Sequence, residues 1–433
     1  MKLNEGQQLA ANKLIAWYND PNKKQVWTLA GYAGTGKSTL ISYVLNELSI
    51  NEDDYALCTP TGKAATVLIN KGSNATTIHR LIYVPYDINE TVVDENGNTI
   101  IKKDVGFRRR DSIDKKLIII DEFSMVGEDI FEDLLSYKVP IICCGDNGQL
   151  PPVKSKMLEY LLNPDAQLSE IMRQDDDSAI LKVATMARTG QYIKPGFYGN
   201  DVIVYDRRFL DNKFILNLCV NADQVICGTN KTSKDLNKQM RNYYGRTSVN
   251  PVKGDKVICL HNNYKIQLND KFSLMNGMLG TVEDYDIMTD NCKNKYALIS
   301  FNPEVTNTTV EDIITDPYTF TDVKSPYEQF NDVYVLPRNR YAIKKILRKR
   351  NPGETREAYN TYAKPELENK RNAKDIVKLN NFDYGYAITC HKSQGSEWDT
   401  VVVFDESYIF KDLKNKWLYT AITRARKKLI IIR

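Results

Sequence analysis

Short apolar runs alternate with amphipathic stretches over most of the 433-residue chain. Apolar runs bounded by polar turn residues are typical of strands that are buried on both faces of a parallel sheet. They occupy residues 25–30, 56–60, 117–120, 140–144, 202–205, 224–227, 400–404 and 429–432. Apolar residues at helical spacing follow several of these runs, at 39–48, 181–188 and 417–422. The pattern therefore predicts an α/β fold with helices on the faces of parallel sheets.

A helix is also expected at the amino terminus, where Leu9, Leu14 and Trp17 have helical spacing. Asn4 is a suitable N-cap, and Gln7, three positions later, is a suitable capping-box partner. The carboxamide of Gln7 also offers a donor and an acceptor, which recognition of adenine requires. Because the helix directly precedes the first strand, the adenine role is favoured for Gln7 over the cap role.

Two regions depart from the α/β pattern. Residues 83–115 contain two β-prone runs around Asn96-Gly97, and Asn-Gly is a strong hairpin signal. This region is predicted to be an inserted β-hairpin. From Gly254 onward, short β-prone runs predict a small β-barrel, followed by a stretch rich in Lys, Tyr and Asn up to about Asn381.

Composition narrows the class of protein. The chain is 42% hydrophobic and 26% charged, as in globular proteins, and its formal net charge of +4 does not by itself indicate a nucleic-acid partner. The basic runs Arg108–Arg110 and Arg338–Arg350 are either solvated faces or local contact sites. Eight cysteines without ligand spacing and three histidines argue against a zinc site. Without a signal pattern or a membrane-length apolar run, we expect an intracellular, cytoplasmic protein with no membrane partner.

The stretch Gly31–Thr39 carries the main candidate chemistry. It fits the phosphate-binding pattern of glycine, four residues and Gly-Lys-Ser, between a predicted strand and a predicted helix. Glycines let backbone N–H groups turn toward phosphate oxygens, and the helix start adds its positive end. Lys37 is expected to reach the β- and γ-phosphates and Ser38 to hold Mg²⁺. The predicted nucleotide contacts in this loop are Gly31, Gly34, Thr35, Gly36, Lys37, Ser38 and Thr39.

Acidic and amide side chains follow two further strands. Asp121 and Glu122 end the run 117–120, at the edge where ligands bind in open α/β sheets. Asp121 is expected to hold Mg²⁺, and Glu122 to orient or deprotonate a water molecule. Gln149 follows the run 140–144 and can sense a γ-phosphate. Arg173 is a candidate electrostatic finger.

Hydroxyl-rich turns follow two more predicted strands. Thr59-Pro60-Thr61 opens a helix, and Thr76, Thr77 and His79 follow shortly after. Such residues suit contacts with a nucleic-acid backbone. Turn and cap chemistry explains the same residues equally well, and a single histidine is usually structural.

The order of these motifs along the chain resembles that of the superfamily 1 helicases of the RecD-like group. Two further motifs are the most specific to that group. They are Thr-Cys-His-Lys-Ser-Gln-Gly at 389–395 and Tyr-Thr-Ala-Ile-Thr-Arg-Ala-Arg at 419–426. The segments at 254–257 and 276–282 look like the SH3-like insertion of that group. The resemblance implies two RecA-like P-loop cores, the first at 1–82 and 116–172 and the second at 173–253 and 382–433. It further implies a hairpin pin at 83–115 and an SH3-like subdomain with an extension at 254–381.

The resemblance also implies an activity and its residues. ATP and Mg²⁺ are the expected cofactors, and Gln7, Gly395 and Arg424 join the nucleotide site, with Arg424 as a finger from the second core. The implied DNA contacts are Pro60, Thr61, Thr77, His79, Asn230, Thr389, His391 and Ser393. A monomer is expected to move 5′ to 3′ on single-stranded DNA and to separate forked duplex DNA, with single-strand-binding, replication or recombination proteins as further partners. The alternative is a nucleic-acid-stimulated ATPase that remodels complexes without unwinding. A metabolic P-loop kinase would need only one core, so the second core and the segment 423–426 argue against it.

Overall fold

The computed structural model describes residues 3–93, 99–151, 158–170, 178–268, 273–289, 295–304, 306, 308–321, 323–325, 333–335 and 376–433. Two compact units make up the chain. The first unit consists of Met1–Tyr83, Arg109–Tyr244 and Tyr386–Arg433, and the second of Val84–Arg108 and Gly245–Gly385. Both parallel sheets lie in the first unit.

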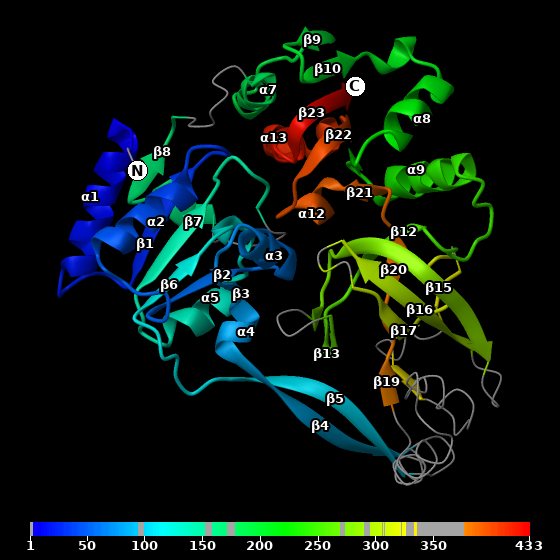
Figure 1. Ribbon diagram of the computed structural model, residues 1–433, viewed down its shortest axis with the longest axis horizontal. Coiled ribbons are helices and arrows are strands. Elements are labelled where there is room, and N and C mark those ends of the chain that lie inside the picture. Colours follow the sequence, from blue (N-terminus) through cyan, green and yellow to red (C-terminus); the bar gives the residue numbers. More distant parts are fainter. Residues whose placement is uncertain are drawn as a thin grey trace, which may run out of the picture. The chain divides into compact units, whose positions relative to one another are not determined.

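The first parallel sheet has the strand order β3-β2-β6-β7-β1-β8 (Figure 1). All neighbouring strands in it are parallel, so their carboxyl ends meet at one edge. The short strand β8 was not predicted from the apolar pattern, and it extends the sheet beside β1. The strands are β1 (Val26–Gly31), β2 (Tyr55–Thr59), β3 (Ala75–Thr77), β6 (Leu117–Ile120), β7 (Ile141–Gly145) and β8 (Ala166–Leu168).

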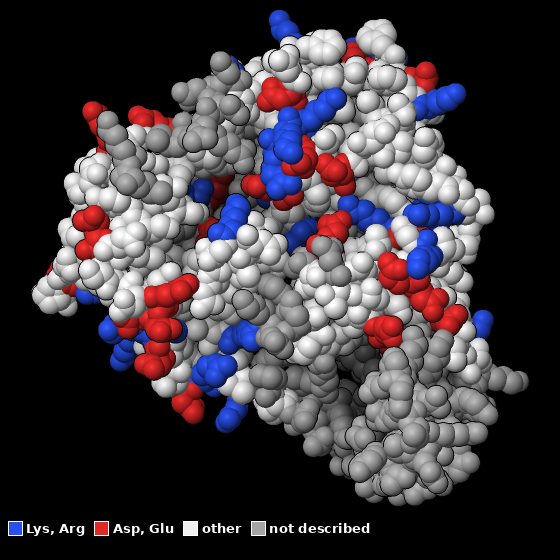
Figure 2. All heavy atoms as spheres, in the orientation of Figure 1, with Lys and Arg blue, Asp and Glu red and all other residues white. Residues whose placement is uncertain are grey.

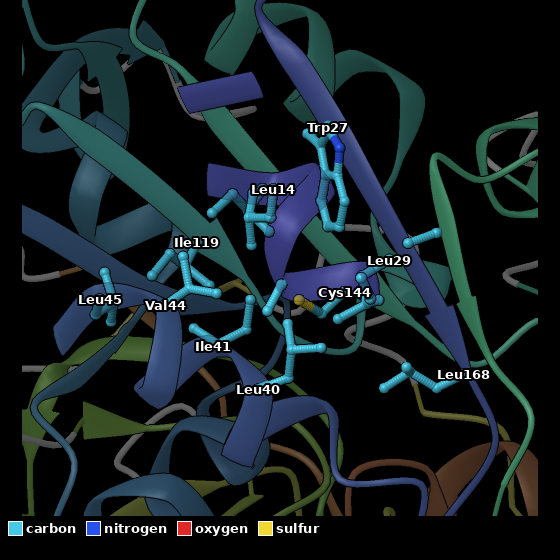
Figure 3. Close-up of a cluster of buried hydrophobic side chains, with 14 of the residues drawn as sticks. Leu14, Trp27, Leu29, Leu40, Ile41, Val44, Leu45, Ile119, Cys144 and Leu168 are labelled. Carbon is cyan, nitrogen blue, oxygen red and sulfur yellow. The ribbon is translucent and has the colours of Figure 1, made fainter. Parts of the chain in front are cut away.

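Helices pack on both faces of this sheet. One face carries α1 (Glu5–Asn19) and α2 (Lys37–Glu47), whose apolar residues meet Leu117 and Ile119 of β6 (Figure 3). The opposite face packs Ile118 and Ile120 against α4 (Ile78–Ile82), α5 (Glu128–Leu135) and α6 (Leu158–Leu162). Successive side chains of a strand point to opposite faces, so a strand with this much apolar sequence requires cover on both.

The local signals at helix starts are confirmed. Asn4 caps α1, and the Asn4–Gln7 capping box is formed in both directions. The helix α2 begins at Lys37, directly after Gly36, which has a left-handed φ of 78°. The helix α3 (Gly62–Asn70) begins after Thr61, the predicted hydroxyl-rich turn.

The second sheet of the first unit has the order β21-β11-β22-β23-β10-β9 (Figure 1). Its strands are parallel except for β9, which runs antiparallel to β10. The helix before the last strand ends at Ile422, as predicted, whereas the final strand begins at Ala425, four residues before the predicted run 429–432. The strands are β9 (Gly196–Tyr198), β10 (Val202–Tyr205), β11 (Gln224–Cys227), β21 (Ala387–Thr389), β22 (Trp398–Phe404) and β23 (Ala425–Ile432).

Helical segments connect the strands of this second sheet. The α-helices are α7 (Ala179–Arg188), α8 (Asn212–Val220), α9 (Asn230–Tyr243), α12 (Cys390–Ser393) and α13 (Lys414–Ile422). The 3₁₀ turns of the first unit are η1 (Phe123–Met125), η2 (Arg207–Phe209) and η4 (Ser407–Leu413). The two sheets and their helices confirm the predicted α/β class with parallel sheets.

The second unit is built from strands. Its largest sheet is antiparallel throughout, in the order β17-β16-β15-β12-β20. This sheet contains the short β-prone runs predicted after Gly254. The SH3-like barrel remains a prediction. The strands of the sheet are β12 (Lys256–Cys259), β15 (Leu279–Thr289), β16 (Lys295–Pro303), β17 (Val310–Thr315) and β20 (Phe382–Tyr384). Two-stranded sheets pair β13 (Asn263–Gln267) with β14 (Ser273–Leu274) and β18 (Val333–Val335) with β19 (Ile376–Lys378).

The strands β4 (Tyr83–Val93) and β5 (Thr99–Arg109) form a further two-stranded sheet. The predicted turn at Asn96-Gly97 lies outside the described residues. The first residue of β4, Tyr83, and the last residue of β5, Arg109, belong to the first unit. The hydroxyl of Tyr83 and the guanidinium of Arg109 both donate to the carboxylate of Asp133 on α5. The hydroxyl of Tyr137 donates to the carbonyl oxygens of Ile82 and Arg110, next to the two strand ends.

Candidate nucleotide and nucleic-acid sites

Three predicted nucleotide segments meet at one edge of the first sheet. The phosphate loop follows β1, Asp121 and Glu122 follow β6, and the loop containing Gln149 follows β7. Strand β7 pairs in parallel with both β1 and β6, so the three loops are neighbours. The structure therefore brings Lys37, Glu122 and Gln149 to the same edge, as the sequence predicted.

The phosphate loop has the backbone that anion binding requires. Gly34 and Gly36 have φ values of 79° and 78°, in the left-handed region that favours glycine. A Cβ on Gly36 would lie 2.4 Å from Nε2 of Gln7, so a larger residue would clash there. No side chain caps the start of α2. Lys37 donates to the carbonyl oxygens of Gly31 at 2.6 Å and Tyr32 at 3.2 Å. Uncapped N–H groups and an ammonium held only by carbonyl oxygens fit a triphosphate.

Gln7 serves the loop as well as its own helix. Its Oε1 accepts the backbone N–H of Asn4 at 3.2 Å, and its Nε2 donates to the carbonyl oxygen of Thr35 at 3.2 Å. Thr35 in turn donates from its hydroxyl to the carbonyl oxygen of Tyr32 at 2.9 Å. The buried carboxamide thus fixes the phosphate loop relative to α1, and its contact with adenine stays a prediction.

Glu122 combines an unusual backbone conformation with a raised side-chain pKa. Its φ of 54° is left-handed, which is strained for a residue with a side chain. Burial, and next the neighbouring Asp121 carboxylate, raise the pKa of Glu122 to about 7, against the opposing pull of Arg424 and Lys37. A carboxyl group whose pKa lies near neutrality can exchange a proton with water at physiological pH.

The remaining first-core groups fit the terminal phosphate and a cation. Oε1 of the buried Gln149 has no hydrogen-bond partner among the described residues, while its Nε2 lies 3.4 Å from Oδ2 of Asp146. Ser38 is exposed at the start of α2, and Asp121 is partly buried at the end of β6. A hydroxyl and one carboxylate are oxygen ligands of the kind that Mg²⁺ accepts alongside phosphate oxygens and water. Within the described ranges, no group of three His, Cys, Asp or Glu side chains could hold a metal ion.

The helix α13, which belongs to the second sheet, contacts the first sheet's loops directly. The hydroxyl of Tyr419 accepts the backbone N–H of Ala33 at 3.0 Å and donates to Oδ2 of Asp146 at 2.7 Å. The hydroxyl of Thr420 accepts the N–H of Leu150 at 2.9 Å. Sequence reasoning did not assign Tyr419 to the site, although it stands in the block 419–426. Its position there, five residues before the predicted finger Arg424, was the available signal.

Arg424 is buried and is hydrogen-bonded to residues around the second sheet. It donates to the carbonyl oxygens of Thr420 at 3.0 Å and Ser396 at 3.2 Å, and to the hydroxyl of Thr423 at 3.1 Å. It is nevertheless close enough to Glu122 to oppose the rise of that residue's pKa. The second predicted finger, Arg173, lies outside the described residues.

Gly395 lies beside the start of α3. Its φ is 72°, and a Cβ there would lie 3.3 Å from Cβ of Ala64 and 3.4 Å from Oγ1 of Thr61. The structure thus places Gly395 of the second core against the first turn of α3. Its predicted contact with nucleotide stays a prediction.

The predicted DNA contacts of the first sheet follow its neighbouring strands β2 and β3. Pro60 and Thr61 come directly after β2, and the Thr61 hydroxyl accepts the N–H of Ala64 at 3.2 Å. Thr77 is buried and caps α4 by accepting the N–H of Arg80 at 3.2 Å. Partial burial lowers the pKa of His79. The cap roles that the sequence left open are therefore occupied, and contact with DNA stays a prediction.

The predicted contacts of the second sheet cluster at the ends of β21 and β11, which pair in parallel. Asn230 is exposed at the start of α9, and Thr389 is the buried final residue of β21. Burial lowers the pKa of His391. Ser393 differs, because it is fully buried and donates to the carbonyl oxygen of Cys390 at 2.7 Å. The described basic and acidic side chains are interspersed on the face seen in Figure 2.

Comparison with known proteins decides the family. An AAA domain model matches residues 2–201, and a UvrD-like helicase C-terminal domain model matches residues 384–432. The ATP-dependent DNA helicase Dda of Enterobacteria phage T4 is 26% identical, with 98% of each chain covered. The uncharacterized protein R530 of Acanthamoeba polyphaga mimivirus is also 26% identical, over 98% of this chain and 99% of the relative. The chain belongs to the superfamily 1 helicases of the RecD and Pif1-like group.

As a superfamily 1 helicase, the protein is an ATP-hydrolysing DNA helicase. Among solved structures, that of Bacteroides Pif1 bound to single-stranded DNA has a TM-score of 0.48 and 18% identity, covering 100% of this chain and 92% of the other. The helicase carries its phosphate loop on the first sheet and Arg424 on the second. None of the helices among the residues that the structure describes is long and apolar enough to cross a bilayer.

Proposed function

We propose that this helicase hydrolyses ATP to move 5′ to 3′ along single-stranded DNA and to separate forked duplex DNA. The observation that carries the proposal is that the second core reaches the phosphate loop. Tyr419 bonds to Ala33 of that loop, and Arg424 lies within electrostatic reach of Glu122. A site assembled from two cores changes their contact whenever its nucleotide state changes, and that change can do mechanical work.

The nucleotide roles are assigned as follows. Lys37 and the loop N–H groups hold the phosphates, Ser38 and Asp121 hold Mg²⁺, and Gln7 recognises the base. When bound, Mg²⁺ would neutralise charge on the phosphate oxygens. Glu122 orients the attacking water or takes a proton from it, and the carboxamide of Gln149 senses the γ-phosphate. Arg424, and with it Arg173, stabilises charge that develops in the transition state.

Arg424 has donors left for a terminal phosphate. Its described hydrogen bonds, all to groups of its own core, use three of the five N–H groups of the guanidinium. A bond from a remaining N–H group to the anionic phosphate would be charge-assisted, and it would join the second core to the bound nucleotide.

DNA is proposed to run along the strand ends of both sheets. Thr61, Asn230 and His391 are at least partly exposed there and suit a sequence-independent grip on the backbone. Pro60, Thr77, His79, Thr389 and Ser393 are assigned to the same surface or its support, whereas Gly395 stays assigned to the nucleotide site. The β4–β5 pair is proposed as the pin that divides the strands, because its base is bonded to Asp133 and Tyr137 of the first core.

The finer assignments complete the proposal. The first core comprises 1–82 and 116–172, and the second 173–253 and 382–433. The region 254–381 is an SH3-like subdomain with an extension. The helicase acts as a monomer in the cytoplasm, with single-strand-binding, replication or recombination proteins as partners.

The direction of movement is tested by strand displacement. Labelled duplexes carry either a 5′ or a 3′ single-stranded tail, and the Lys37→Ala variant serves as the control without hydrolysis. We expect release of the labelled strand only from the 5′-tailed duplex, and only with ATP and Mg²⁺. Release only from the 3′-tailed duplex would reverse the proposed direction. DNA-stimulated hydrolysis without release from either duplex would favour the remodelling ATPase.

A further inference from the structure

The phosphate loop carries an aromatic side chain that the second core covers. Tyr32 directly follows Gly31 in the loop, and the guanidinium carbon of Arg188 lies 3.6 Å from the centre of its ring. Arg188 is the last residue of α7, which precedes the second sheet. The contact is a cation stacked on an aromatic face at close range.

The stack is what fixes the guanidinium. The guanidinium of Arg188 has no hydrogen bond or ion pair to any described residue, and its Nε is buried without a partner among them. Arg424, in contrast, has three hydrogen bonds within its own core. A buried N–H donor without an acceptor is unfavourable unless another attraction offsets it, and the face of Tyr32 supplies that attraction here.

The same ring touches a second residue of the second core. The rings of Tyr32 and Tyr419 meet edge to face, with centres 6.4 Å apart. Gly148, beside the predicted γ-phosphate sensor Gln149, lies against both partners. A Cβ on Gly148 would lie 3.0 Å from Cε1 of Tyr419 and 3.1 Å from Cδ of Arg188. Tyr32, Arg188 and Tyr419 therefore form one packed cluster on the loops of the nucleotide site.

The backbone of Tyr32 links this cluster to the phosphate-binding lysine. Lys37 donates to the carbonyl oxygens of Gly31 and Tyr32. When Lys37 turns to a phosphate, the carbonyl of Tyr32 loses this donor while its side chain stays between Arg188 and Tyr419. A change in the nucleotide bound to the loop therefore affects Tyr32, whose side chain packs against Arg188 and Tyr419 of the second core.

We propose that the Tyr32–Arg188 stack transmits the nucleotide state of the phosphate loop to the second core, with Arg188 as a positioning residue for the Arg424 finger. The proposal rests on the proposed ATP-driven function. Arg188 sets how closely the second core seats on the loop, so its loss lowers turnover more than nucleotide binding. The cationic plane and the aromatic face are both required, whereas the hydroxyl of Tyr32, which has only a 3.5 Å contact with Nε2 of Gln167, is not.

A double-mutant cycle on DNA-stimulated ATP hydrolysis tests this. Arg188→Met keeps the length of the side chain without the charge, and Tyr32→Leu keeps an apolar side chain without the ring. We expect each to lower kcat about fivefold, with less than a twofold change in the Kd of a fluorescent ATP analogue, and the double variant to be no worse than either single one. Tyr32→Phe should retain wild-type kcat, and Arg188→Lys should recover part of it. Arg208→Met, which removes an exposed arginine of the same unit, should have no effect.

The outcomes separate the inference from the function on which it rests. A wild-type protein without DNA-stimulated hydrolysis would contradict the proposed function itself. Wild-type activity together with unchanged kcat in Arg188→Met would overturn the inference alone. The inference would also be overturned if the fold-decrease in kcat of the double variant equals the product of the two single decreases, since the two residues would then act independently. Thermal unfolding of each variant identifies any loss of kcat that comes from misfolding. If Arg188→Met or Tyr32→Leu is misfolded, the kcat values of Arg188→Lys and Tyr32→Phe are compared with wild type instead.

Discussion

The hydroxyl of Tyr419 accepts the backbone N–H of Ala33 at 3.0 Å, although 386 positions separate the two residues. The same hydroxyl donates to Oδ2 of Asp146 at 2.7 Å. Burial and the Asp146 carboxylate raise the pKa of Tyr419, so the phenol stays neutral and keeps its proton for this bond. One side chain of the second core thereby holds two loops of the nucleotide site.

Replacing Tyr419 by Phe removes both hydrogen bonds and keeps the ring. We expect a roughly tenfold lower kcat for DNA-stimulated hydrolysis and a loss of about 1–2 kcal/mol in the free energy of unfolding, since Asp146 is buried. Steady-state hydrolysis and denaturant unfolding measure the two effects. Tyr408→Phe is the matched control, because that ring is 71% exposed. An unchanged kcat would show that Tyr419 only supports the fold.

Replacing Lys37 by Ala should abolish ATP hydrolysis, with a loss of at least about a hundredfold, because no other group replaces the ammonium at the phosphates. The fold should persist, since the lysine bonds only to carbonyl oxygens of its own loop. Phosphate release with saturating DNA measures turnover, and Lys71→Ala at an exposed position is the control. Full turnover in Lys37→Ala would remove the nucleotide-site assignment.

Replacing Arg424 by Ala should lower hydrolysis by about a hundredfold or more while the Kd for ATP changes less than about threefold, as expected of a finger that acts in the transition state. Stopped-flow binding and single-turnover hydrolysis separate the two quantities. The neighbouring Arg426→Ala is the control, because Arg426 is exposed and pairs with Asp399 at 2.6 Å. A loss confined to ATP binding would contradict the finger role.

Glu122 predicts a pH dependence of stability in the absence of nucleotide and Mg²⁺. Its pKa is raised from 4.5 to about 7 in the folded protein, so the folded state binds the proton more tightly than the unfolded state. Its contribution to stability is therefore complete below about pH 4.5 and is lost as pH rises toward 7. Glu122→Gln should be more stable than wild type at pH 8 by roughly 1–3 kcal/mol, and this advantage should shrink at pH 5.

Denaturant unfolding in a chelating buffer at both pH values measures this difference. Glu128→Gln is the control, because Glu128 lies in the first turn of α5, outside the nucleotide site. If Glu122→Gln changes the free energy of unfolding equally at pH 5 and pH 8, the pKa of Glu122 is not raised in the folded protein. The same variant should hydrolyse ATP poorly, since it lacks the proposed base.

Shortening the β4–β5 pair should impair strand separation more than hydrolysis. In this variant the part of β4 and β5 farthest from Tyr83 and Arg109 is deleted, and a short Asn-Gly turn joins the shortened strands. Tyr83 and Arg109 are kept, and with them their hydrogen bonds to Asp133. We expect DNA-stimulated hydrolysis within about twofold of wild type and unwinding of forked duplex reduced about tenfold, because stepping continues without a wedge. Equal losses in the two assays would exclude the pin.

Features that depend on contiguous residues were determined by the sequence. Apolar runs required strands covered on both faces, and the structure has them in two parallel sheets. The Gly-x-x-x-x-Gly-Lys-Ser pattern required a left-handed turn before a helix, and Gly36 and α2 provide it. Asp121, Glu122 and Gln149 follow strands whose ends meet because parallel strands align their carboxyl ends. Each of these follows from backbone geometry or from the alternation of a strand.

Features that join distant segments were decided only by the tertiary structure. The stacking of Arg188 on Tyr32 and the bonds of Tyr419 depend on how the second sheet's helices dock on the first sheet's loops. The burial of Ser393 also follows from packing, since its hydroxyl could equally have faced solvent. Packing contacts carry no local sequence pattern, because any residue of suitable shape and charge can make them. For this helicase, the sequence specified the phosphate loop, and the tertiary structure decided which residues of the second core lie against it.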